Sequence, residues 1–269
     1  MIRMDMKQVA QAVNVLGRFC GVRDVAELTP AALRGRFGFE RADAMVLFGG
    51  SILAGGDVLA DAMRIGVADR YVIVGGAGHT TDTLRQVVAD ACPDVETAGR
   101  TEAEIFQGYL RTVHGLEADF LETASTNCGN NIIYLLDLLA REGVPCDRVI
   151  LTQDATMQRR MDAGMRKFSP ATTVVNYAAY SVEAVAGESA CGGLTFAGDV
   201  PRGMWNMNRY INLLMGEIPR LTDDVQGYGP AGAGYIAHVD MPAEVAAAYE
   251  LLRDEYGAAA RVANSAFAS

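Results

Sequence analysis

The sequence has no long hydrophobic run and no stretch rich in lysine and arginine, and only 21% of its residues are charged. No run approaches the roughly 20 apolar residues that a membrane-spanning helix needs. The 269 residues include 33 acidic and 23 basic side chains, giving a formal net charge of −10. Nucleic-acid-binding proteins normally present a basic face, and proteins that bind anionic membranes use the same attraction. We therefore expect neither nucleic acid nor membrane as a partner, and instead a small, locally bound ligand.

Cysteine and histidine are also sparse. Five cysteines occur without C-x-x-C spacing, and only three histidines occur, without an H-x-x-x-H pair. An odd number of scattered cysteines favours reduced thiols in a cytoplasmic protein over a disulfide framework. The first 20 residues contain no apolar core of a signal peptide, so we expect a cytoplasmic location. We expect no metal site, and the sequence leaves the oligomeric state open.

The residues that are present favour a globular α/β protein. Half of the residues are hydrophobic, 21% are charged, and 29 are glycine. Short apolar runs stop at Gly-Gly or at a polar triplet, which is typical of buried parallel strands that enter tight turns. Strands are expected at 44–48, 71–74, 148–152 and 171–178, with another ending at Glu122. Helices are expected at 5–20, 56–66, 81–91, 101–115, 128–142 and 155–168. This alternation predicts a doubly wound, mostly parallel sheet.

The pattern changes after residue 179. Residues 1–179 are predicted to form the α/β domain, and residues 180–269 a loop-rich and helical C-terminal part packed on the sheet domain. A helix containing Pro219 should end at that proline. The glycine-rich segment 226–236 should be a loop that lies over or beside the ligand crevice.

Four polar or glycine-rich segments directly follow predicted strands. In an open parallel sheet, ligands bind in the crevice outside the carboxyl ends of the strands. Any one of these segments could be an ordinary turn, but four at one edge indicate a binding site. The candidate binding residues are Gly49, Gly50, Ser51, Gly75, Gly76, Gly78, His79, Ser125, Thr126, Asn127, Asn131, Gln153, Asp154 and Arg159.

The segment "STNCGNN" (125–131) contains more polar side chains than a turn requires. Ser125, Thr126 or Asn127 can cap the helix that follows, whose first amides favour an anionic group. One cap leaves the other polar groups for a ligand. In the helix after the fourth strand, Arg159 and Arg160 point about 100° apart, so at most one of them faces the crevice.

The sequence shows no complete catalytic motif. The loop "GGAGH" lacks the third glycine of a dinucleotide fingerprint, and there is no P-loop and no G-x-S-x-G motif. An enzyme could use Glu102 or Glu122 as acid or base. A binding or sensing module would use the same groups without turnover. We favour a protein that binds a nucleotide-like small molecule; the alternative is a hydrolase or transferase acting on a phosphorylated or nucleotide substrate.

The sequence resembles the SanA/YdcF-like family, whose function is uncharacterised. The resembling stretches are "AGRTEAEI", "STNCGNN", "TQDATMQRRM", "MGEIPRLTDDVQGYGP" and "AHVDMPAEV", and they extend along nearly the whole chain. Cys128 and Asn130 stand where the family pattern has Thr and Glu. Asp154 occupies a segment that carries a His in many relatives. The resemblance implies a Rossmann-like fold and an association with S-adenosylmethionine.

Overall fold

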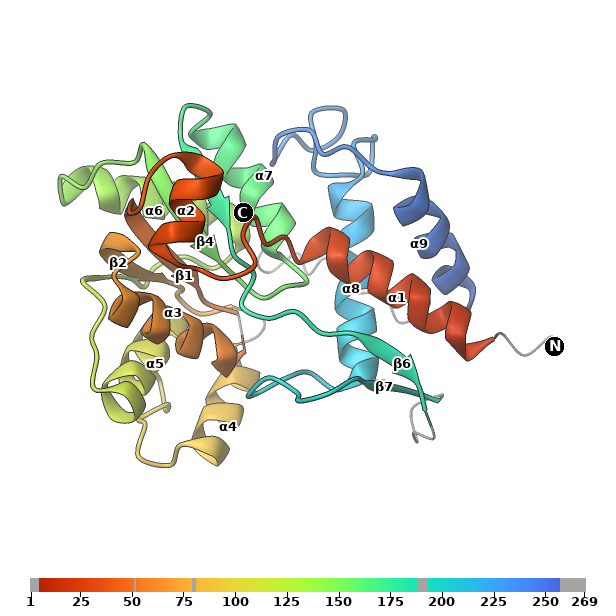
Figure 1. Ribbon diagram of the computed structural model, residues 1–269, viewed down its shortest axis with the longest axis horizontal. Helices are drawn as coiled ribbons and strands as arrows, with labels where there is room; N and C mark the ends of the chain where they lie inside the picture. The colour runs from red at the N-terminus through yellow and green to blue at the C-terminus, as the bar shows by residue number, and fades with distance from the viewer. Residues whose placement is uncertain (1–4, 51, 79–80, 188–192, 257–269) are drawn as a thin grey trace.

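The computed structural model describes residues 5–50, 52–78, 81–187 and 193–256. Its centre is a sheet of five parallel strands in the order β3-β2-β1-β4-β5 (Figure 1). The strands are β1 (Ala42–Phe48), β2 (Ala68–Val74), β3 (Phe120–Glu122), β4 (Arg148–Thr152) and β5 (Thr173–Asn176). The three strands expected at the centre of the sheet are therefore confirmed. Every residue of β1 is buried, as the continuous apolar run predicts for a strand covered on both faces.

Helices cover both faces of this sheet. One face packs against α2 (Pro30–Phe37), α3 (Leu53–Ile65), α4 (Thr81–Ala91) and α5 (Glu102–Tyr109). The other face packs against α6 (Cys128–Arg141) and α7 (Gln158–Phe168). The chain moves outward from β1 to β3 and then crosses back to β4, so the order of strands reverses between β1 and β4. This is a doubly wound, Rossmann-like fold.

The first helix, α1 (Met6–Cys20), packs mainly on the C-terminal part of the chain. It shares a hydrophobic cluster with α8 (Met207–Leu221) and α9 (Ala243–Tyr256). Figure 1 shows these three helices together on one side of the sheet. The apolar face of α1, which the sequence pattern predicted, therefore packs against the C-terminal helices α8 and α9.

Three local features differ from the sequence expectations. Pro219 lies within the last turn of α8 and does not end the helix, which continues to Leu221. The region 180–199, for which no regular pattern was evident, contains an antiparallel pair, β6 (Ala184–Ala186) and β7 (Leu194–Phe196). The expected helix 101–115 is α5 continued by a π-helical turn, η1 (Leu110–His114), which ends at Gly115 with a φ of 67°.

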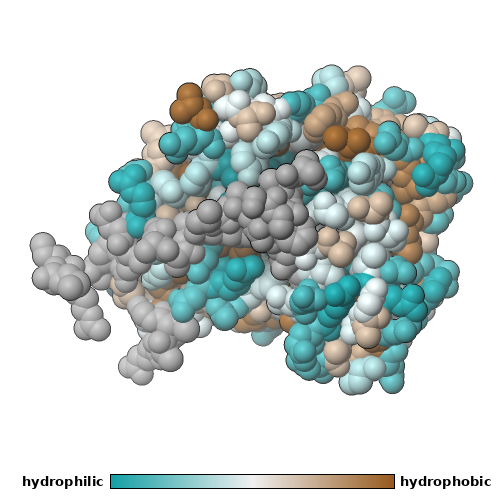
Figure 2. Space-filling view, turned by 180° about the vertical axis from the view of Figure 1, so that it is seen from behind, coloured by the Kyte–Doolittle hydropathy of each residue, from teal (hydrophilic) through white to brown (hydrophobic). Residues whose placement is uncertain are grey.

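One face of the molecule is mostly polar. Figure 2 shows a face on which hydrophilic and weakly polar residues predominate and hydrophobic residues occur in small groups. Among the described residues, no helix is both long enough and apolar enough to cross a membrane.

The glycine-rich segment 226–236 is a loop, as expected. The amide of Tyr228 donates to the carbonyl of Arg220 (2.9 Å), and the amide of Ala237 donates to the carbonyl of Ala163 in α7 (2.9 Å). The loop is thus fastened to α7 and to the end of α8. Its role as a lid over the crevice stays a prediction.

His238, just after this loop, forms two pH-sensitive hydrogen bonds. Its Nδ1 lies 2.5 Å from Asp223 Oδ2, and its Nε2 lies 3.1 Å from Asp240 Oδ1. The hydrogen bonds to Asp223 and Asp240 raise the pKa of His238. The hydrogen bonds of protonated His238 therefore stabilise the folded protein fully at a pH below the ordinary histidine pKa. This stabilisation is lost as the pH rises through the raised pKa. We expect an NMR titration of His238 to show the raised pKa, with Asp223→Asn lowering it more than Asp240→Asn. An ordinary pKa in the unmodified protein would contradict this account.

Candidate functional site

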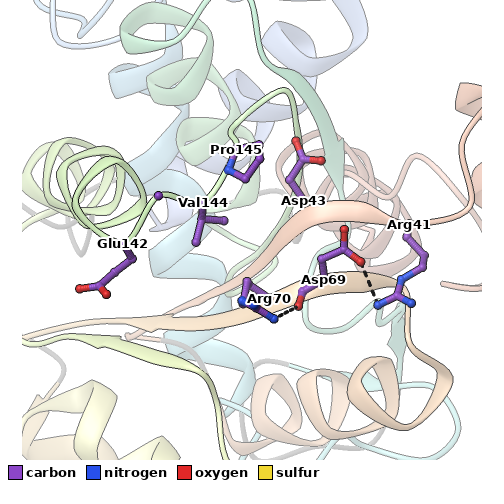
Figure 3. Close-up of a pocket in the computed structure, with 8 residues that line it drawn as sticks. Arg41, Asp43, Asp69, Arg70, Glu142, Val144 and Pro145 are labelled. Carbon is purple, nitrogen blue, oxygen red and sulfur yellow. Dashed lines mark hydrogen bonds and ion pairs between the residues drawn. The ribbon is translucent and has the colours of Figure 1, made fainter.

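The sheet has two ends that could bind a ligand. A hollow of about 410 Å³ lies at the amino ends of β1 and β2, between these strands and the loop after α6. Figure 3 shows the residues that line it. Its charged side chains already have partners in or beside the hollow. Arg41 bonds to Asp69 at 2.9 Å, and Asp43 bonds to Arg148 at 2.7 Å while also accepting two backbone amides. The carboxyl end is where parallel sheets bind ligands, and most of the described residues predicted for the site follow strands there.

Glu102 lies at this carboxyl edge, at the start of α5. Its backbone amide donates to the carbonyl of Gly76 at 2.9 Å, and that of Ala103 donates to Gly75 at 2.8 Å. The side chain is 7% exposed, and its Oε1 accepts a hydrogen bond from Thr81 Oγ1 at 2.9 Å. The carboxylate is therefore held between the ends of β1 and β2.

The glycines at these strand ends permit the close approach of Glu102. A Cβ on Gly49 would lie 2.7 Å from the Cβ of Glu102, and one on Gly75 would lie 3.0 Å from the same atom. The sequence suggested that these glycines cradle a ligand. In the structure, the absence of side chains at these glycines leaves room for Glu102. A ligand at this point would therefore contact Glu102 as well as the glycine backbone.

This contact predicts the effect of a single added methyl group. We expect Gly49→Ala to lower the free energy of unfolding by about 1–3 kcal/mol, because Glu102 and the start of α5 must move. Gly35 in α2 is the matched control, since a Cβ there meets nothing within 4 Å. Gly35→Ala should stabilise the protein by about 0.5–1 kcal/mol through helix propensity. Urea unfolding measures both, and a Gly49→Ala protein as stable as the original would show that Glu102 is not held there.

Glu122 is the last residue of β3, and its carboxylate accepts hydrogen bonds from the loop that follows. Its Oε1 accepts the amides of Ala124 (2.6 Å) and Ser125 (3.0 Å). Ser125 in turn accepts the amide of Gly76, through its carbonyl at 3.0 Å and its Oγ at 3.3 Å. A Cβ on Gly76 would lie 2.7 Å from the carbonyl oxygen of Thr123, so this position also requires glycine. The hydrogen bonds between Gly76 and Ser125 thereby connect the loops that follow β2 and β3.

The segment 125–131 contains the helix cap that the sequence left open among three residues. Asn127 is the N-cap of α6, and its Oδ1 accepts the amide of Asn130 at 2.9 Å. Ser125 is buried and belongs to the contact with Gly76, whereas Thr126 is exposed. Asn131 is 8% exposed in the first turn of α6. A Cβ on Gly78 would lie 3.3 Å from the carbonyl of Thr126, which places the loop after β2 beside this segment.

Gln153 and Asp154 follow β4 and are engaged with the protein itself. Gln153 Nε2 donates to the carbonyl of Gly49 at 3.0 Å, which links β4 to β1 where the strand order reverses. Asp154 accepts hydrogen bonds from Thr156 Oγ1 (2.7 Å), Tyr180 Oη (2.9 Å) and Trp205 Nε1 (2.7 Å). Burial raises the pKa of Asp154 despite these donors. Sequence reasoning missed Tyr180 and Trp205, since nothing local in the sequence marks either as a partner of Asp154.

The two arginines of α7 point in different directions, as their spacing predicts. Arg159 stacks on the ring of Phe19 at 4.2 Å, and its Nε donates to the carbonyl of Phe19 in α1. Arg160 is mostly buried and forms two hydrogen bonds with Glu217 of α8, at 2.6 and 2.9 Å. Burial tends to lower the pKa of Arg160, but the nearby Cys128 thiol and Glu217 carboxylate together raise it. Arg160 is thus the arginine beside segment 125–131, and Glu217 is its partner.

Gly50 follows β1 with a φ of 73°, a backbone conformation that favours glycine. Ser51 and His79, also predicted for the site, lie outside the described residues. Within the described part of the chain, no group of three or more His, Cys, Asp or Glu is placed to hold a metal ion. A comparison with models of known protein families found no match.

Proposed function

We propose that the protein binds a small nucleotide-like molecule at the carboxyl edge of its parallel sheet, and that S-adenosylmethionine is one candidate ligand. Two buried side-chain oxygens carry this proposal. Among the described residues, Glu122 Oε2 and Thr152 Oγ1 are the buried side-chain N and O atoms without a hydrogen-bond partner. Each belongs to the last residue of a strand, β3 or β4, at this edge. Buried polar atoms are nearly always paired, so such exceptions often mark functional positions.

The chemistry of the edge suits a ligand with hydroxyl groups or a positive charge. The carboxylates of Glu102 and Glu122 are both buried there. S-adenosylmethionine offers ribose hydroxyls and a sulfonium that would complement acidic groups. Its own carboxylate would be favoured near the first amides of α6. The resemblance to the SanA/YdcF-like family supports the same ligand.

A binding role is favoured over phosphoryl chemistry by the state of the arginines. Enzymes that act on phosphates place cationic groups where the charge of the transition state develops. In α7, Arg159 is bound to α1 and Arg160 to Glu217. Arg159, which was predicted to bind the ligand, and Arg160 are thus both bound to other parts of the protein.

A thermal-shift screen with S-adenosylmethionine, adenosine, AMP, ATP and sugar phosphates tests the proposal. A ligand present at 100 times its Kd should stabilise the protein by about 2.7 kcal/mol. The ligand-induced shift should shrink in Glu122→Gln and remain in Asp69→Ala, which alters the hollow at the amino edge. If none of these compounds raises the melting temperature, or if only Asp69→Ala removes the shift, the proposed function is wrong.

A further inference from the structure

The local hydrogen bonds around Glu122 leave its second carboxylate oxygen without a donor from the backbone. The amides of Ala124 and Ser125 are taken by Oε1, and the amide of Gly75 by the carbonyl of Glu122 at 2.9 Å. The amide of Gly76 is taken by Ser125. These four amides are therefore committed to other acceptors. The turn itself does not satisfy Oε2, although less than 1 Å² of this atom is exposed.

The arginines of α7 do not neutralise this carboxylate either, because Arg159 is bound to Phe19 and Arg160 to Glu217. A buried carboxylate oxygen without a donor is costly, since it loses the hydrogen bonds that water would provide. A group that approaches Oε2 is favoured when it donates an O–H or N–H. A phosphate or carboxylate at the same point is disfavoured by repulsion.

We propose that Glu122 Oε2 accepts a hydrogen bond from a sugar hydroxyl of the ligand, so that the β3 end of the crevice binds the nucleoside sugar rather than a phosphate. This inference rests on the proposed function and specifies it further. Glu122 is then a binding residue that selects hydroxyl-bearing nucleosides, and deoxy analogues are discriminated against. The turn 123–125 holds the carboxylate in place for this purpose through Oε1.

Isothermal titration calorimetry with adenosine, 2′-deoxyadenosine and 3′-deoxyadenosine tests the inference. The unmodified protein should bind adenosine at least about tenfold more tightly than one of the two deoxy analogues, the expected effect of a hydrogen bond to a charged group. In Glu122→Gln, the amide Nε2 replaces the acceptor with a donor while Oε1 can still accept the turn amides. The preference for adenosine should then fall to about threefold or less. Glu117→Gln, an exposed acidic position just before β3, is the matched control and should retain the full preference.

The outcomes separate the two proposals. If adenosine binds and neither deoxy analogue binds more weakly, the inference about Glu122 is wrong and the proposed function stands. If Glu122→Gln folds and keeps the full preference, the inference is wrong as well. Should Glu122→Gln fail to fold, the comparison of the three nucleosides on the unmodified protein still decides. If adenosine, ATP and S-adenosylmethionine all fail to bind, the proposed function and the inference fall together.

Discussion

Replacing Glu217 with alanine should lower the free energy of unfolding by about 3–5 kcal/mol, because it leaves the Arg160 guanidinium buried without its partner. Both side chains of this pair are largely inaccessible to solvent, with exposures of 12% for Arg160 and 4% for Glu217. The pair connects α7 of the sheet to α8 of the C-terminal part. Its loss should therefore loosen the contact between these two regions.

The double variant Arg160→Met, Glu217→Leu provides the decisive comparison. Replacing both charges with apolar side chains is often neutral or stabilising, so the double variant should recover most of the lost stability. Glu250→Ala, which removes an exposed partner of Arg253 in α9, is the control and should change stability by about 0.5 kcal/mol or less. Urea unfolding of the four proteins measures these differences in stability. A Glu217→Ala protein that matches the Glu250→Ala control would contradict the buried pair.

Asp154→Ala should lower the free energy of unfolding by about 2–4 kcal/mol, because Tyr180 and Trp205 would keep buried or half-buried donors without an acceptor. These two partners come from the segments before and after β6 and β7, so Asp154 fastens the C-terminal part to the end of β4. Asp61→Ala is the control, since Asp61 is an exposed partner of Arg64 on α3. It should change stability by about 0.5 kcal/mol or less.

Chemical denaturation followed by the fluorescence of Trp205, the one tryptophan of the chain, reports on this contact directly. In the unmodified protein, the Trp205 signal should change together with far-ultraviolet circular dichroism. In Asp154→Ala, the Trp205 signal should change at a lower urea concentration than in the unmodified protein. Equal midpoints in the two proteins would show that Asp154 contributes no more than a surface aspartate.

The sheet could be predicted from the sequence because its signals are local. An apolar run such as 44–48 that stops at Gly-Gly reports its burial and its end within a few residues. Because the strands are parallel, their carboxyl ends lie at one edge of the sheet, and the order of strands reverses between β1 and β4. The place proposed for the binding site follows from these two facts.

The partners of the site residues could not be predicted in the same way. A glycine such as Gly49 signals that something approaches closely, but not that Glu102, more than 50 residues later, is the approaching group. Asp154 was expected to face a ligand, yet its acceptors are used by Tyr180 and Trp205 from the C-terminal part. The spacing of Arg159 and Arg160 predicted two directions without saying which one leads to segment 125–131.

The most direct test of the central claim is a map of backbone amide chemical shifts during titration with adenosine or S-adenosylmethionine. The account predicts that the largest changes cluster at 75–78, 122–127 and 152–156, the segments that meet at the carboxyl ends of β2, β3 and β4. Largest changes at Asp43, Asp69 and 142–145, around the hollow at the amino edge, would contradict it.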